Sequence, residues 1–122
     1  MIRLLQIGCG YWGEKLGERL AKLADTVGFY DIDKAKAVSL FEKVSTAGAK
    51  YVVNNFEKEL LGFDACIIAT PSSAHYKIVK QCLNANRHVL VEKPMTLNYA
   101  EAAGLVELAQ SKKLTLMTDS TF

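Results

Sequence analysis

Three glycines near the start of the chain have the spacing G-x-G-x-x-G, a pattern of residues that can bind phosphate. Gly8, Gly10 and Gly13 follow the largely apolar run Leu4–Ile7 and open a segment with helical periodicity. In such a strand-to-helix turn the first glycine allows a sharp reversal, the second lets a pyrophosphate approach the backbone, and the third lets the helix pack against the sheet. The helix N-terminus adds free N–H groups and the positive end of its dipole. The pattern predicts a dinucleotide-binding turn, with a ligand-free glycine turn as the alternative. The predicted cofactor-binding residues of this turn are Gly8, Gly10, Tyr11, Trp12 and Gly13.

An aspartate lies at the end of the second predicted strand, 18 residues after Gly13. The carboxylate of Asp31 can accept hydrogen bonds from both hydroxyls of an adenosine ribose, and it repels a 2′-phosphate. We therefore expect NAD rather than NADP. Lys34 and Lys36 follow closely, so NADP stays an alternative. The other interpretation of Asp31 is a turn or helix-capping residue, a role for which Asp33 competes.

Polar residues end two further apolar runs. Thr70-Pro71-Ser72 follows residues 65–69, with His75 in the first turn of the next helix, and Glu92-Lys93-Pro94 follows residues 89–91. Ligands of an open parallel sheet bind at the carboxyl ends of its strands, so these side chains are candidates for a site. Taken alone, a histidine near a helix start is more often a surface or capping residue than a catalytic one. The charged pair is equally well explained as solvated strand-end residues.

Length and composition limit the class of protein. A chain of 122 residues, half of them hydrophobic and 23% charged, fits one soluble globular domain. The net charge of +2 is too small to indicate a nucleic acid or membrane partner, and no apolar run approaches a membrane span or a signal peptide. The three cysteines are widely spaced and form no C-x-x-C pair, which favours reduced thiols over a disulfide or metal site. We expect a cytoplasmic protein without a metal.

Strand and helix patterns alternate along the whole chain. Strands are predicted over residues 3–7, 26–31, 50–53, 63–70, 88–91 and 114–118. Helices are predicted over residues 12–24, 56–61 and 73–85, with further helices after Asp33 and Asn98. The first helix has an apolar stripe of Trp12, Leu16, Leu20 and Leu23, and Asn86 stands where a helix ends in a left-handed residue. Repeated β-α units predict an α/β fold: a doubly wound parallel sheet of Rossmann type with helices on both faces, in a single domain.

Together these motifs resemble a known family. The glycine turn, Asp31, Ala69-Thr70-Pro71 with His75, and His88–Pro94 occur in the order and at the spacing of the glucose–fructose oxidoreductase, inositol dehydrogenase and MocA family. The similarity to the N-terminal domain of that family covers all 122 residues, and the Glu-Lys-Pro strand end is its most diagnostic part. Members of the family are NAD(P)-dependent oxidoreductases. Most of them act on sugars, polyols and related compounds by hydride transfer to C4 of nicotinamide.

The resemblance implies roles for residues at the strand ends. The implied cofactor-binding residues are the glycine turn, Asp31, Thr70, Pro71, Ser72, His75 and Glu92. The glycine turn and Asp31 would hold the pyrophosphate and the adenosine ribose. The segment after the fourth strand would line the path to the nicotinamide ribose, and Glu92 would lie beside the nicotinamide. Lys93 would be the catalytic residue that reaches the substrate hydroxyl, and Pro94 would follow a cis peptide bond.

The chain departs from the family pattern in two places. Asn86 replaces a usual glycine, and residues 119–122 replace a usual glycine followed by His, Tyr or Asn. Family members continue into a second α/β domain that supplies most substrate contacts, the oligomer interface and commonly a general base. We therefore expect residues 1–122 to be the dinucleotide-binding domain of a homo-oligomeric enzyme, and a fragment inactive by itself.

Two other interpretations of the sequence stay open. One is a free-standing dinucleotide-binding module without catalysis. The other is the cofactor domain of a different two-domain dehydrogenase, such as homoserine dehydrogenase or dihydrodipicolinate reductase. The Glu-Lys-Pro context argues against this second alternative.

Overall fold

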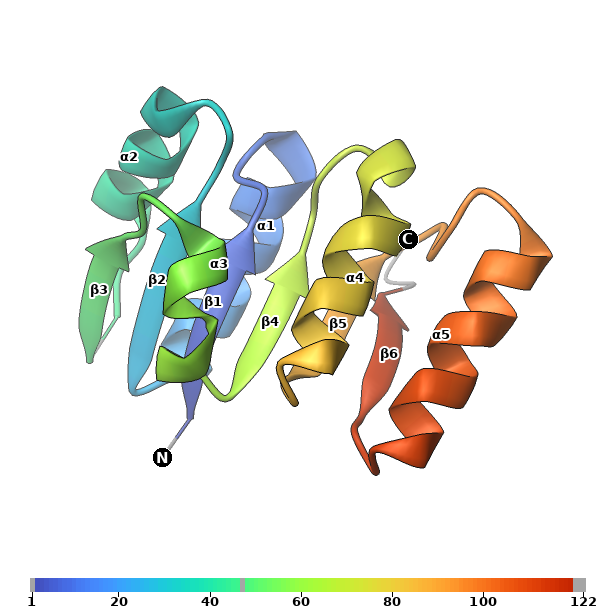
Figure 1. Cartoon of the computed structure of the whole chain (residues 1–122). Helices are drawn as coiled ribbons and strands as arrows, with labels where there is room; N and C mark the ends of the chain where they lie inside the picture. Colours follow the sequence, from blue (N-terminus) through green and yellow to red (C-terminus); the bar gives the residue numbers. More distant parts are fainter. Residues whose placement is uncertain (1, 47, 120–122) are drawn as a thin grey trace.

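Six parallel strands form one sheet in the order β3-β2-β1-β4-β5-β6 (Figure 1). This computed structural model describes residues 2–46 and 48–119. The strands are β1 (Arg3–Ile7), β2 (Thr26–Tyr30), β3 (Ala49–Val52), β4 (Ala65–Ile68), β5 (His88–Glu92) and β6 (Leu116–Asp119). The helices are α1 (Tyr11–Leu20), α2 (Lys34–Lys43), α3 (Phe56–Glu59), α4 (His75–Asn84) and α5 (Tyr99–Ser111). Short 3₁₀ turns η1 (Ala21–Leu23), η2 (Leu60–Gly62) and η3 (Ser72–Ala74) adjoin α1, α3 and α4.

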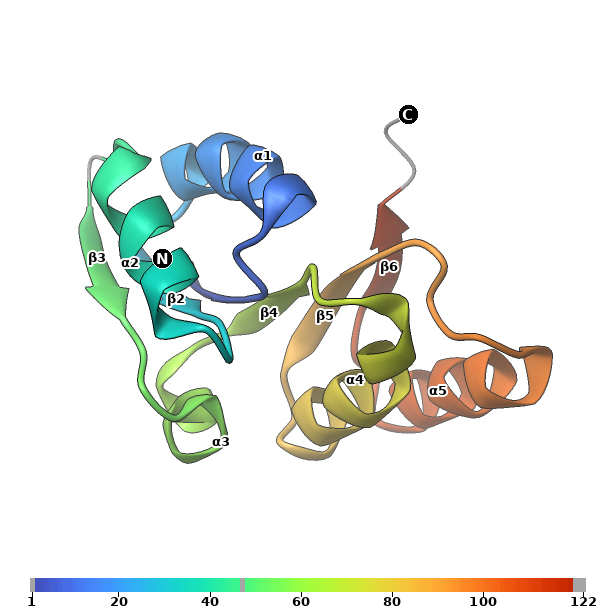
Figure 2. The ribbon, with the colours of Figure 1, turned by 90° about the horizontal axis from the view of Figure 1, so that it is seen from above.

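The helices cover both faces of the sheet. Seen from above, α1 and α2 lie on one face, and α3, α4 and α5 lie on the other (Figure 2). The chain builds outward from β1 to β3 and then returns to add β4 on the other side of β1. The strand order therefore reverses between β1 and β4, which places a crevice outside the carboxyl ends of these two strands. The predicted Rossmann-type fold is confirmed.

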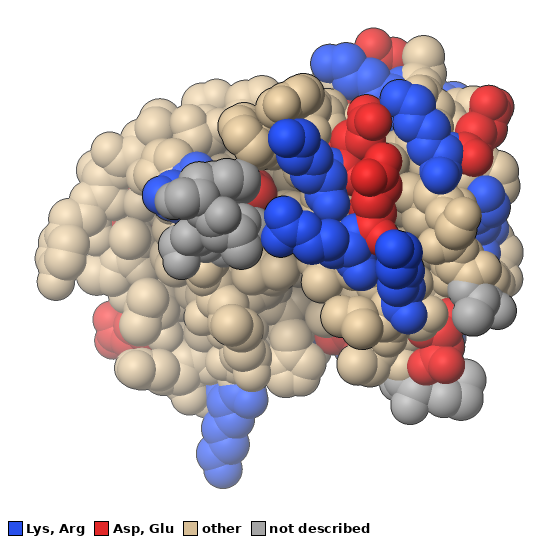
Figure 3. Space-filling model, turned by 180° about the vertical axis from the view of Figure 1, so that it is seen from behind, with Lys and Arg blue, Asp and Glu red and all other residues tan. Residues whose placement is uncertain are grey.

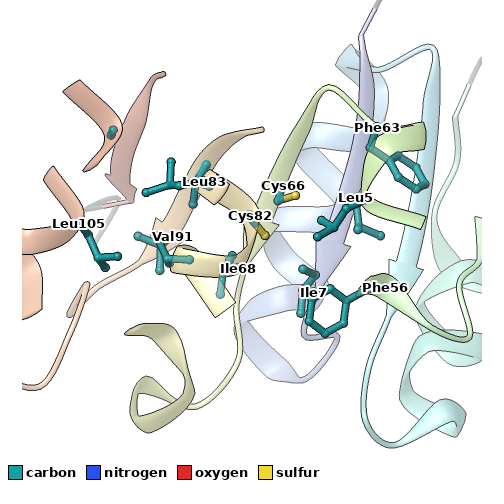
Figure 4. Close-up of a cluster of buried hydrophobic side chains, with 14 of the residues drawn as sticks. Leu5, Ile7, Phe56, Phe63, Cys66, Ile68, Cys82, Leu83, Val91 and Leu105 are labelled. Carbon is teal, nitrogen blue, oxygen red and sulfur yellow. The ribbon is translucent and has the colours of Figure 1, made fainter. Parts of the chain in front are cut away.

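Apolar side chains from the strands form the core. In the larger of two clusters, side chains of β1, β4 and β5 face α3, α4 and α5 (Figure 4). Val89 and Val91, which point to the same face of β5, are 2% and 0% exposed within it. The second cluster lies under α1 and α2, around Phe29 and Leu40. Burial of each such side chain contributes about 1.5–3 kcal/mol, so the core fixes the strand ends that carry the polar residues.

Local signals place the helix ends correctly. The side chain of Asp33 accepts a hydrogen bond from the N–H of Ala35 (3.1 Å), and that of Asn98 accepts one from the N–H of Glu101 (2.9 Å). Asn86 has a φ of 61°, the left-handed conformation predicted for the end of α4. These caps leave fewer helix-end groups unsatisfied, which is why short sequence patterns identify them.

The predicted apolar stripe of the first helix is wrong at both ends. Leu16 is buried and Leu20 is half-buried, but Trp12 is 46% exposed and Leu23 is 72% exposed. Helix α1 ends at Leu20, and Leu23 lies in the tighter 3₁₀ turn, where the period of 3.6 residues no longer applies. Trp12 lies at the start of the helix, where it lines a cleft.

Across residues 2–46 and 48–119, the helices of the fold are too short or too polar to span a membrane. The departure from the family pattern at residues 120–122 lies outside the described residues.

Candidate cofactor-binding site

The glycine turn is closely packed at both ends and open in the middle. Gly8 has a φ of +101°, and a Cβ there would lie 2.5 Å from the carbonyl carbon of Ala69. A Cβ on Gly13 would overlap the carbonyl oxygen of Gly8. A Cβ on Gly10 would meet no atom of the described residues within 4 Å. The first and third glycines are therefore required by the fold, and the second leaves the space at the N-terminus of α1 where a pyrophosphate is predicted.

Gln6, which belongs to none of the predicted motifs, holds this turn from beneath. Its side chain is 0% exposed, and its Nε2 donates hydrogen bonds to the carbonyl oxygens of Gly8 (3.0 Å) and Gly13 (2.5 Å). One amide group therefore ties the entrance of the turn to the first turn of α1. The only signal in the sequence is an amide inside an otherwise apolar strand, directly before the glycines.

Asp31 joins the glycine turn to the loop after β2. Its Oδ2 accepts a hydrogen bond from the N–H of Cys9, and its Oδ1 accepts one from the N–H of Asp33, both at 2.8 Å. Asp33, and not Asp31, is the N-cap of α2. Each carboxylate oxygen can accept more than one hydrogen bond, so this anchoring leaves capacity for ribose hydroxyls. The turn role is thus observed, and the ribose role stays a prediction.

Cys9 is a structural residue of the turn. Its side chain is buried, and Sγ donates a hydrogen bond to the carbonyl oxygen of Tyr30 (3.4 Å). Burial, together with the nearby charge of Asp31, raises the pKa of the Cys9 thiol to about 12. The thiol therefore stays protonated at neutral pH and is a poor nucleophile.

A cleft of about 500 Å³ lies at the carboxyl ends of β4 and β5, beside the start of α1. It brings together residues from three separate segments: Trp12, Ala69, Thr70, Pro71, Ser72, His75, Glu92, Lys93 and Pro94. These include the residues predicted at the ends of both strands. The glycines and Asp31 lie at the same edge of the sheet, at the ends of β1 and β2. Contact of any of these residues with a cofactor remains a prediction.

The wall formed by the end of β5 carries the charges of the cleft. Glu92 is 8% exposed, whereas the side chain of Lys93 is exposed at the rim. The Lys93–Pro94 peptide bond is cis, as the resemblance implied. An ammonium that borders the cleft can donate a hydrogen bond to an oxygen bound there and stabilise negative charge on it.

An aromatic side chain, Trp12, lines the cleft from the start of α1. The Tyr11 ring packs edge-on against the Trp12 ring, with centroids 4.8 Å apart. The Nζ of Lys15 lies 4.8 Å from the centroid of Tyr11 and 5.3 Å from that of Trp12. Tyr11 is 67% exposed and lies outside the cleft lining, so a contact between Tyr11 and the cofactor also stays a prediction.

His75 lies deeper than the sequence indicated. Its ring is 1% exposed, with Nδ1 2.8 Å from the carbonyl oxygen of Pro94 and Nε2 2.8 Å from that of Thr70. The histidine is therefore not a surface residue, and it is not the N-cap of α4, which is Ala74. It connects the two strand-end segments that form the walls of the cleft.

Comparison with known proteins agrees with this fold. A family described as "Oxidoreductase family, NAD-binding Rossmann fold" matches residues 2–120. The 4-carboxy-2-hydroxymuconate-6-semialdehyde dehydrogenase of Sphingobium sp. is 30% identical, with 98% of this chain and 38% of that protein covered. The UDP-N-acetylglucosamine 3-dehydrogenase of Acidithiobacillus ferrooxidans is 29% identical, with 90% and 34% covered. A solved structure of the latter superposes with a TM-score of 0.85 at 27% identity, covering 96% of this chain and 37% of that one. The chain thus spans about a third of the length of these relatives.

Proposed function

The chain belongs to the glucose–fructose oxidoreductase, inositol dehydrogenase and MocA family of oxidoreductases, and from that premise we propose that residues 1–122 are its dinucleotide-binding domain. The protein that carries this domain transfers hydride between a nicotinamide cofactor and an alcohol or ketone of a sugar, polyol or related small molecule. The observation that carries the proposal is that the glycine turn, Asp31 and the cleft share one edge of the sheet, at its topological switch point.

Each part of this edge has its own task in the proposal. The open space at Gly10 and the N–H groups at the start of α1 receive the pyrophosphate. Asp31, already oriented by two backbone N–H groups, accepts hydrogen bonds from the adenosine ribose and disfavours a 2′-phosphate, so NAD is preferred over NADP. The cleft beyond Trp12 receives the nicotinamide half, with Glu92 beside it. When bound there, nicotinamide supplies the hydride acceptor or donor.

Lys93 is the proposed catalytic residue. Its exposed ammonium at the rim of the cleft can donate a hydrogen bond to the substrate hydroxyl as that group loses its proton. A fixed cation stabilises the developing negative charge more in the transition state than in the ground state. Most substrate contacts, the general base and the interface of a homo-oligomer belong, in this proposal, to a second domain of a longer protein.

Cofactor binding by the chain is the direct test. Trp12 is the only tryptophan in the sequence and lines the cleft, so its fluorescence reports on that site alone. Titration with NADH should quench it and produce energy transfer to the reduced nicotinamide, and NADPH should bind more weakly. Trp12→Phe should remove the signal, while calorimetry should still detect binding. An absence of binding by both methods at millimolar NAD(H) would contradict the proposal.

A further inference from the structure

The two walls of the cleft come from segments that continue beyond the paired parts of their strands. The register of β4 and β5 ends at Ile68 and Val91, and the chain then leaves the sheet as residues 69–74 on one side and 93–96 on the other. These segments carry Thr70 and Lys93, so their separation sets the width of the cleft. A contact between the walls outside the sheet therefore has a direct effect on its shape.

His75 makes such a contact with both of its ring nitrogens. It is the first residue of α4, and its ring points away from solvent, between the carbonyl oxygens of Thr70 and Pro94. Both partners are hydrogen-bond acceptors only. A neutral imidazole has one N–H and donates to one of them, whereas the imidazolium has two and satisfies both contacts at once. In either protonation state, His75 therefore donates a hydrogen bond to at least one of the two walls.

We infer that His75 is a positioning residue: it braces the Thr70 wall against the Lys93–Pro94 wall and does not itself contact the reactants. The part of this inference that concerns the nicotinamide half and Lys93 rests on the proposed function. His75 is 1% exposed and both ring nitrogens already lie 2.8 Å from protein oxygens, so both have protein partners. The brace acts on the nicotinamide end of the site and not on the glycine turn.

The test compares two ligands and two variants. His75→Phe keeps a ring of similar bulk and removes both nitrogens. Loss of the buried hydrogen bonds should weaken NADH binding by about tenfold. ADP-ribose lacks the nicotinamide and should bind to this variant within about twofold of the parent affinity. His88→Phe alters the other histidine, an exposed residue whose Nδ1 accepts a hydrogen bond from the N–H of Thr115, and should change neither affinity. An equal loss for both ligands, or no loss for either, would overturn the inference.

Two measurements without cofactor keep this test separate from that of cofactor binding. In the parent chain, a ring N–H of His75 should exchange slowly with solvent in proton NMR spectra, and His88→Phe removes the other histidine signal. Ring N–H exchange at the rate of an exposed imidazole would overturn the inference, even if His75→Phe fails to fold. If the variant folds, faster amide exchange should be confined to residues 70–74 and 93–96, and a change throughout the sheet would reject the brace.

Discussion

Asp31 has an observed role in the turn and a predicted role at the adenosine ribose, and substitution can separate the two. Asp31→Ala should weaken NAD binding by on the order of 1–3 kcal/mol, through loss of hydrogen bonds to the ribose. The same change should weaken NADP binding less, or strengthen it, because it removes a charge that repels the 2′-phosphate. Calorimetric titration of both cofactors measures the difference.

A control is needed because Asp31 also anchors the N–H groups of Cys9 and Asp33. Asp31→Asn keeps an amide oxygen of similar shape but has no charge. If charge decides the preference, Asp31→Asn should shift the ratio of NADP to NAD affinity in the same direction as Asp31→Ala. An unchanged ratio in both variants would show that Asp31 is only a turn residue.

Lys93 is expected to act on the chemical step in whatever longer protein carries this domain. Lys93→Met keeps the bulk of the stem and removes the donor and the charge. It should lower kcat by roughly two to three orders of magnitude while cofactor affinity stays within a few-fold. Lys93→Arg should recover little, since a broad planar guanidinium cannot occupy the position of an ammonium. Steady-state kinetics with each variant measures the effect.

The rival account makes Lys93 a structural neighbour of Glu92 that steadies the end of β5. In that case Lys93→Met would lower Tm and leave kcat almost normal in the folded fraction. A thermal melt recorded beside the kinetics separates the two accounts. Lys77→Met, on the exposed surface of α4, serves as the control for loss of a lysine charge and should change neither quantity.

At the scale of an element, substitutions in the glycine turn can separate effects on the free energy of unfolding from effects on NAD affinity. Gly13→Ala forces a Cβ against the carbonyl oxygen of Gly8, and overpacking of this kind costs roughly 1–3 kcal/mol. Gly10→Ala places its Cβ in open space at an ordinary φ of −77°, so the free energy of unfolding should change little. If the pyrophosphate approaches Gly10, the second variant should still lose NAD affinity. Denaturant unfolding and titration of both variants test this; parent-like NAD affinity in a stable Gly10→Ala protein would place the pyrophosphate elsewhere.

The sequence predicted the elements because their signals are local. The caps at Asp33 and Asn98 and the left-handed Asn86 each depend on a few neighbouring residues, and the structure confirms all three. The alternation of apolar runs likewise predicts a parallel sheet with helices on both faces. The predicted strand 3–7 matches β1, whereas the end of the first helix differs from the prediction by four residues, because end geometry depends on neighbouring segments.

Features that depend on distant segments could not be predicted. Helical periodicity places Trp12 in the core stripe, but the sheet ends before it, and the residue lines the cleft instead. The burial of His75 depends on residues 70 and 94 lying on opposite sides of its ring. Gln6 has no recognisable pattern, because its partners are backbone carbonyls. The candidate site could thus be predicted as a set of residues, but not the contacts that shape it.

At the scale of the whole molecule, one part of the sheet has no helix over it within the described residues. The side of β5 and β6 opposite α4 and α5 is bare (Figure 2). Leu90 and Met117 are paired there, pointing away from Val89 and Leu116, and Met117 is 57% exposed. Seen from behind, Lys, Arg, Asp and Glu side chains gather over α1 and α2, while the surface toward β6 is largely uncharged (Figure 3).

We expect this chain to turn over no sugar or polyol by itself and to self-associate through the uncharged face. A substrate held only by the cofactor domain lacks most of its positioning contacts, and orientation accounts for several kcal/mol of a barrier. Exposed apolar surface favours association, so Met117→Lys should shift the chain toward monomer in sedimentation experiments. Val106→Lys, on the exposed side of α5, is the matched control. Robust activity from a preparation verified as 122 residues by intact mass would reject the first expectation, and a monomeric parent chain the second.

Gln6 and His75 share a property that bears on how such a site diversifies. Both hold the site by contacts with backbone carbonyl oxygens, a group that every amino acid provides. The side chains at positions 70–72 can therefore change in size and polarity without removing the groups that fix the walls. We therefore expect such a scaffold to tolerate mutations in the lining of the cleft and to restrict mutations of Gln6 and His75 beneath it. Selection for a new substrate could then alter the lining of the cleft while the architecture is inherited intact.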